Sequence, residues 1–129
     1  MVTDVFDKEE NRMNHIRDVF KTLTWREENV LRFYFGIDVE RRLTLEEIGE
    51  DYDLTVRTIK RHIIKGIRKM MHPTRSRLLI SHIDKDLIER CEIKNWNNFK
   101  LMDELMEQLL YPPREIVEKW VIMGKEEMF

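Results

Sequence analysis

The side chains with the clearest chemical potential in this sequence are the cations of one short segment. Between Thr55 and Arg77 there are eight Lys or Arg residues and no Asp or Glu, whereas the whole chain has 23 basic and 25 acidic residues and a net charge of -2. Lysine and arginine neutralise phosphate, and an arginine can also form two hydrogen bonds with guanine. This segment therefore predicts binding to double-stranded DNA. The alternative is a solvated helix face whose cations favour the helix C-terminus.

A capped short helix precedes these cations. Thr44 followed by Glu47 is a capping box, in which each side chain accepts a hydrogen bond from the other residue's backbone N–H. Gly49 and the cluster at residues 51–53 favour an early turn after this helix. Thr55 is a second N-cap, and we expect its helix to end near residue 71. Two helices joined by such a turn form a helix-turn-helix, whose second helix enters the major groove of DNA. The paired helix favours the DNA interpretation.

The second helix is predicted to have one apolar and one cationic face. Its apolar residues recur every three or four positions and should face the core: Ile59, Ile63, Ile67 and Met70. The outward side of its first two turns, which is the part that reaches base edges, should carry Arg57, Thr58, Lys60 and Arg61. Further along, the residues expected to meet phosphate or a partner protein are Lys65, Arg68 and Lys69. Arg42 beside Thr44, and Thr55 itself, are further candidate DNA contacts at helix N-termini. His62 is left open between packing and contact.

Two stretches together resemble a known family. LTWREENVLRFYFGID (Leu23–Asp38), followed by TLEEIGEDYDLTVRTIKRHIIKGIRKMMHPTRS (Thr44–Ser76), is similar to region four of primary sigma factors of bacterial RNA polymerase. The resemblance implies a four-helix domain that binds the flap of the polymerase beta subunit and reads the upstream promoter element. The positions that match the flap-binding groove include Phe35, Ile37 and Met70. Judged one at a time, each of these three also suits a core position.

The sequence departs from this family at the DNA-reading positions. Where primary sigma factors typically have an Arg-Glu pair after the capping Thr, this chain has Val56 and Arg57, and their Gln one turn later is matched by Arg61. A glutamate that accepts a hydrogen bond from cytosine is thus replaced by cations. We expect stronger attraction to phosphate and a different sequence selection.

The predicted fold is all-α, with a sigma region-four-like helix-turn-helix domain at residues 1–85 and an acidic helical extension at residues 86–129. Before the domain's central helices, an apolar face from Met13 onward predicts one helix, and the capping box of Thr24 begins another. That second helix should end at Gly36, with Trp25 at its first position expected to pack, although an exposed aromatic there could anchor a partner.

The extension has ten acidic and six basic residues. An amphipathic helix from residue 99 to residue 110, followed by a final helix after Pro113, would form an extra C-terminal pair. This pair either packs on the domain or docks another protein. The terminal Glu126-Glu127-Met128-Phe129 is similar to the hydrophobic-acidic motifs that phage late-transcription factors use for a sliding clamp, and it suggests a clamp as a partner. The resemblance fits a phage or a cellular source.

Several function classes are not supported by the composition. One cysteine, Cys91, excludes an intramolecular disulfide, and the four histidines lack paired metal-ligand spacing. No membrane-spanning apolar run or basic leader is present, so we expect a cytoplasmic protein without a membrane partner. No catalytic motif occurs, and we predict neither an enzyme nor a cofactor.

No segment resembles the promoter-melting region of a sigma factor. If Met1–Phe129 is a complete chain, it should therefore act with a partner, such as a second sigma-like subunit. Three roles remain open at this point. The chain is a sigma-like factor that binds the flap and promoter DNA, an appropriator or anti-sigma protein that occupies the flap without reading DNA, or a plain helix-turn-helix regulator.

Overall fold

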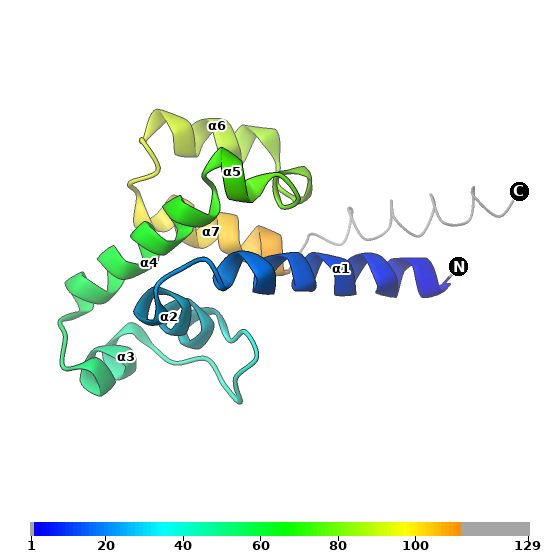
Figure 1. Ribbon diagram of the computed structural model, residues 1–129. Helices are drawn as coiled ribbons and strands as arrows, with labels where there is room; N and C mark the ends of the chain where they lie inside the picture. Colours follow the sequence, from blue (N-terminus) through cyan, green and yellow to red (C-terminus); the bar gives the residue numbers. More distant parts are fainter. Residues whose placement is uncertain (1, 112–129) are drawn as a thin grey trace, which may run out of the picture.

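The structure is a computed structural model that describes residues 2–111, and within them helices are joined by short connections without any strand (Figure 1). The predicted all-α class is confirmed. The predicted helix after Pro113 lies outside the described residues. None of the helices in residues 2–111 is both long and apolar enough to cross a membrane. The elements are α1 (Val2–Phe20), α2 (Trp25–Phe35), α3 (Leu45–Tyr52), α4 (Val56–Met70), α5 (Pro73–Ser76), the 3-10 turn η1 (Ile80–His82), α6 (Lys85–Ile93) and α7 (Phe99–Leu110).

Threonine caps fix where three of these helices begin. Thr24 and Thr44 are the N-caps of α2 and α3, and each completes the predicted capping box with the glutamate three residues later. Thr55 caps α4 by accepting a hydrogen bond from the N–H of Thr58 at 3.2 Å. Gly36 ends α2 in the left-handed conformation, with φ 73, as its sequence position predicts.

The turn between α3 and α4 depends on a glycine inside α3. The N–H of Leu54 donates to the carbonyl of Gly49 at 2.8 Å, so the turn folds back against the helix. A Cβ added to Gly49 would lie 2.6 Å from the Leu54 carbonyl oxygen. The early turn predicted from Gly49 and residues 51–53 is present, since α3 ends at Tyr52 with Asp53 as its C-cap, and the missing side chain of Gly49 permits this close approach.

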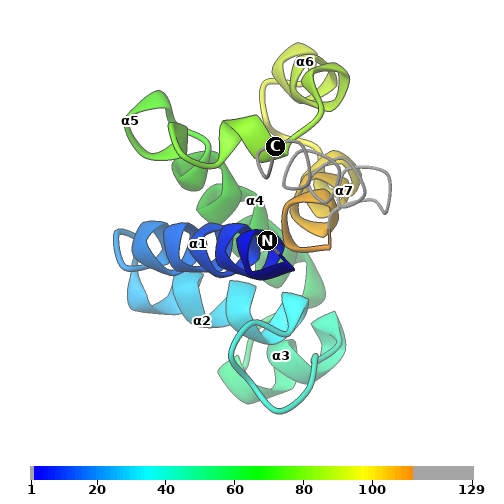
Figure 2. The ribbon, with the colours of Figure 1, turned by 90° about the vertical axis from the view of Figure 1, so that its right-hand side faces the viewer.

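Helix α4 runs through the centre of the fold, with α2, α3, α5 and α7 packed around it (Figures 1 and 2). Its predicted core face is confirmed, since Ile59, Ile63, Ile67 and Met70 are all fully buried. Each such side chain contributes about 1.5–3 kcal/mol through burial. At the crossing with α2, a Cβ on Gly66 would lie 2.9 Å from Leu31 Cδ1, so the two helices approach closely there.

The N-terminal helix α1 extends further than its apolar pattern predicted, because it begins at residue 2. Its apolar face is confirmed by the burial of Ile16, Val19 and Phe20. The expectation that Trp25 packs was wrong. Trp25 is 70% exposed, and its ring meets the edge of the Tyr52 ring with centroids 6.4 Å apart.

Helices α6 and α7 pack against each other after an irregular segment. Cys91 is fully buried in α6, where it acts as a small apolar packing residue. Between the helices, Asn95 and Trp96 adopt left-handed backbone angles, with φ 55 and 54, and Asn98 caps α7. The amphipathic helix predicted at residues 99–110 is therefore present.

Asp38 ties the loop after α2 to two helices. Its carboxylate accepts two hydrogen bonds of 2.9 Å from Arg17 of α1 and one of 2.9 Å from Arg32 of α2. These bonds, the Arg17 bond above all, lower the pKa of Asp38 to about 2 although partial burial opposes the shift. The loop is therefore held by a charged clamp that needs the ionised carboxylate.

Replacing Asp38 with Asn should remove this clamp while keeping a residue that tolerates the left-handed backbone. Because the folded-state pKa is depressed, the stabilisation is present above about pH 4 and is lost as the pH falls toward 2. We expect a loss of about 1 kcal/mol at pH 7, after allowance for solvent screening, and a smaller loss at pH 2. Urea unfolding at both pH values measures this. An equal loss at the two pH values would contradict it, and Asp18→Asn, in an exposed pair, is the matched control.

Candidate nucleic-acid interface

Four cations form one stripe along α4. Arg57, Arg61, Lys65 and Arg68 recur every three or four residues, so they share one side of the helix, and all four are exposed. Within residues 2–111, none of them forms a hydrogen bond or an ion pair. This set is called the cation stripe below. Its charges face solvent and are available to an external anion.

Lys60 lies outside the cation stripe, although it was predicted to point outward together with Arg57 and Arg61. Its ammonium nitrogen is 5.2 Å from the centroid of the Phe99 ring at the start of α7, and the residue is half-buried. Each residue advances about 100° around a helix, so Lys60 is roughly a quarter turn away from Arg61. Its charge is directed toward α7.

The threonines predicted to contact DNA act as caps in this structure. Thr44 and Thr55 are exposed at the N-termini of α3 and α4, and each hydroxyl accepts a backbone N–H of its own helix. Thr58 is half-buried, and its hydroxyl is 2.9 Å from that of Thr55. Any contact of these residues with DNA stays a prediction.

Arg42 is engaged within the protein. Its Nε donates to the carbonyl of Tyr34 at 2.9 Å, and its Nη1 lies 3.1 Å from Glu107 of α7. The guanidinium also lies over the Tyr34 and Phe35 rings. The sequence predicted a phosphate contact beside Thr44, whereas the structure directs Arg42 toward α7.

Lys69 was expected to meet phosphate or a partner, and in this structure its charge is engaged within the protein. Its Nζ lies 2.8 Å from Oε1 of Glu27, which is 3% exposed. Burial alone would raise the pKa of Glu27, but hydrogen bonds from Lys69 and Thr24 leave it lowered. Lys69 therefore neutralises a buried carboxylate that also caps α2.

The three predicted polymerase contacts lie in the core. Phe35 and Met70 are 0% exposed and Ile37 is 3% exposed, so none of them is on the surface formed by the described residues. They belong to the same buried cluster as the apolar residues of α7. The sequence pattern could not reveal this cover, because α7 follows Met70 by almost thirty residues.

One cation near the stripe was not anticipated. Arg26 of α2 is exposed, and its guanidinium lies 5.9 Å from the centroid of the Tyr52 ring. His62 is half-buried beside it, and burial first, then the charge of Arg26, lower the pKa of His62. No spacing rule within α4 marks Arg26, because it belongs to a different helix.

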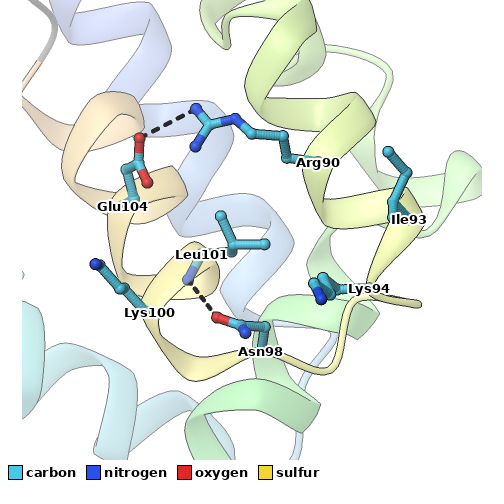
Figure 3. A pocket seen from close by; sticks show the side chains of 7 residues that line it. All are labelled: Arg90, Ile93, Lys94, Asn98, Lys100, Leu101 and Glu104. Atoms are coloured by element: carbon cyan, nitrogen blue, oxygen red, sulfur yellow. Dashed lines mark hydrogen bonds and ion pairs between the residues drawn. The ribbon is translucent and has the colours of Figure 1, made fainter.

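The described residues offer little for catalysis. They contain no group of three or more His, Cys, Asp or Glu residues that could hold a metal ion. A pocket of about 400 Å³ lies between α6 and α7, and its one carboxylate, Glu104, is paired with Arg90 at 3.2 Å (Figure 3). The pocket is lined by Arg90, Ile93, Lys94, Asn98, Lys100, Leu101 and Glu104. It lacks a paired acid and base or an activated nucleophile.

The geometry places this protein in the helix-turn-helix class. A short capped helix, a tight turn and a longer helix with a solvent-facing cationic side are the features by which this class presents a helix to DNA. Residues 19–72 match the family described as Sigma-70, region 4, which confirms the predicted resemblance over this segment.

A relative supports the same relationship. The chain is 46% identical over 74 residues to the RNA polymerase sigma factor SigA of Bacillus sp. The matched segment covers 57% of this chain and 18% of the relative, so the chain spans less than a fifth of that protein's length.

Proposed function

We propose that this protein is a sigma-like transcription factor that binds promoter DNA through α3 and α4 and binds the beta-subunit flap of RNA polymerase. The observation that carries the proposal is the cation stripe, which faces solvent on the second helix of a helix-turn-helix in a chain of net charge -2. A sigma-70 region 4 match over residues 19–72 supports the same function. Its action is binding, with no enzymatic step or cofactor.

The cation stripe divides into two parts along the helix. Arg57 and Arg61 lie on the first two turns, which reach base edges in this class of fold, and each can bind guanine O6 and N7. Lys65 and Arg68 lie further toward the C-terminus and are placed for phosphate contact. The first pair would then select sequence, and the second would supply affinity that falls with salt.

Val56, Arg57 and Arg61 replace residues typical of primary sigma factors. We propose that the promoter sequence read by this protein differs accordingly. An acceptor for cytosine is absent at these positions, and two guanidinium groups prefer guanine.

Replacing Arg61 with Ala should weaken binding to the selected promoter and relax its selectivity. A bidentate contact discriminates by about 1–3 kcal/mol, so we expect a roughly ten-fold or greater loss of affinity for the preferred site and a smaller loss for random DNA. Gel shifts with both duplexes measure this. Lys94→Ala, which removes an exposed charge after α6, is the control and should change neither affinity. Equal affinities of the Arg61→Ala variant and the parent would remove base reading from the proposal.

The polymerase contact separates this function from its alternatives. An appropriator or anti-sigma protein would bind the flap and have little need for DNA, and a plain regulator would bind DNA alone. The solvent-facing cation stripe favours a role that includes DNA. A second sigma-like subunit that melts the promoter, and a sliding clamp bound by the extension, stay predictions.

The isolated flap domain should retain this protein in a pull-down. The double variant Arg57→Ala/Arg61→Ala should be retained equally, because these side chains face away from the core that the flap-binding positions share. Absence of flap binding together with retained DNA binding would favour the plain regulator. Flap binding without any DNA binding would instead favour the appropriator.

A further inference from the structure

Helix α7 covers the side of the domain to which the polymerase contacts are assigned. The ring centroid of Phe99, the first residue of α7, lies 5.9 Å from that of Tyr34. The hydroxyl of Tyr111, which directly follows α7, donates to the carbonyl of Phe35 at 3.3 Å. Helix α7 also packs against α4 (Figures 1 and 2). Its buried apolar residues are Met102, Leu105, Met106, Leu109 and Leu110. The three assigned contacts are thus buried in a core to which α7 contributes.

Polar contacts hold the C-terminal half of α7 in place. Glu107 forms an ion pair with Arg42, 3.1 Å long, in which the side chains are 39% and 46% exposed. The Nη2 of Arg12 donates to the carbonyl of Leu110 at 3.5 Å. Such a partly exposed pair contributes little, whereas a like charge placed at the same position would repel Arg42.

Two features work against tight docking of α7. One oxygen of Asp103, Oδ1, is buried and has no hydrogen-bond partner among the described residues, and burial raises the pKa of this carboxyl group. Burying an incompletely bonded carboxylate is unfavourable. In addition, the connection from α6 passes through Asn95 and Trp96 in left-handed conformations, and such angles are uncommon for Trp.

We propose that α7 is an internal occupant of the polymerase-binding groove and that the flap binds by displacing it. The proposal rests on the proposed function, because it assumes that the flap binds at Phe35, Ile37 and Met70. The incoming segment must replace what α7 supplies. It is therefore an amphipathic helix with apolar residues at positions i, i+3, i+4, i+7 and i+8 and an acidic group that faces Arg42.

An internal occupant makes a quantitative prediction about affinity. The measured dissociation constant equals the intrinsic constant divided by the fraction of molecules in which α7 is displaced. Any change that loosens α7 without altering the groove should then tighten flap binding, and any change that tightens α7 should weaken it. DNA affinity should respond to neither change, because among the described residues the cation stripe forms no hydrogen bond or ion pair with α7.

The test uses the full chain, the isolated flap domain of the beta subunit as the probe, and three variants. Glu107→Arg places a cation opposite Arg42 and should loosen α7. Asp103→Asn removes the buried charge and should tighten it. Glu89→Arg, the same change at an exposed position on α6, is the matched control. We expect roughly three-fold or greater tightening of flap binding for Glu107→Arg, a similar weakening for Asp103→Asn and no change for Glu89→Arg.

Amide hydrogen exchange of α7 provides a second measurement on the same samples. Exchange should be faster in Glu107→Arg and slower in Asp103→Asn than in the parent. If the parent chain does not bind the flap detectably and the Glu107→Arg variant does, the proposal is also supported. Equal flap affinities despite altered exchange would overturn it and leave the proposed function intact. Unchanged exchange in both variants would overturn it as well. Failure of every variant, Glu107→Arg included, to bind the flap would overturn both this proposal and the polymerase contact.

Discussion

The ion pair between the buried Glu27 and the partly exposed Lys69 fixes how α4 is rotated against α2. Glu27 caps α2 through Thr24 and, at the same time, accepts Lys69 at 2.8 Å, so the start of one helix is joined to the end of the other. Gly66 lets the two helices approach closely at this crossing. Once that rotation is set, the isoleucines of α4 face inward and the cation stripe must face solvent. Removing Lys69 would be destabilising, because the buried Glu27 carboxylate would lose its cation.

The distribution of ion pairs concentrates positive charge on one surface. Several arginines outside α4 are neutralised by carboxylates, since Arg17 and Arg32 share Asp38 and Arg42 binds Glu107. Arg41 binds Glu47 at 2.6 Å and contributes most to holding the pKa of that carboxyl near 2. The cation stripe has no such carboxylate among the described residues. A chain that is acidic overall can therefore present a strongly basic face.

Sequence patterns that span a few residues predicted the helix caps and the buried face of α4. The caps at Thr24, Thr44 and Thr55 and the apolar face of α4 follow from spacing over a few residues, and the structure contains all of them. Partners chosen across the fold were not predictable in this way. Lys69 finds Glu27 across 42 residues of sequence. The helical period gives the side of the helix on which a lysine lies, but not which carboxylate the fold brings to that side.

The same limit applies to the predicted binding residues. Lys60 and Arg42 are directed toward α7, and sequence periodicity does not specify where a later helix will dock. Phe35, Ile37 and Met70 match groove positions of sigma region four. In this protein they are buried in the same core as the apolar residues of α7. Trp25 is exposed because its ring contacts the edge of one neighbour, Tyr52, rather than the core.

The central claim is that opposite faces of α4 have separate tasks, and the salt dependence of DNA affinity tests it most directly. Each phosphate contact adds about 0.9 to the slope of log affinity against log salt concentration. Lys65→Ala should reduce this slope by about 1. Lys69→Ala should leave the slope unchanged under conditions in which the protein remains folded, because Lys69 is occupied by Glu27. A slope reduced as much by Lys69→Ala as by Lys65→Ala would contradict the account.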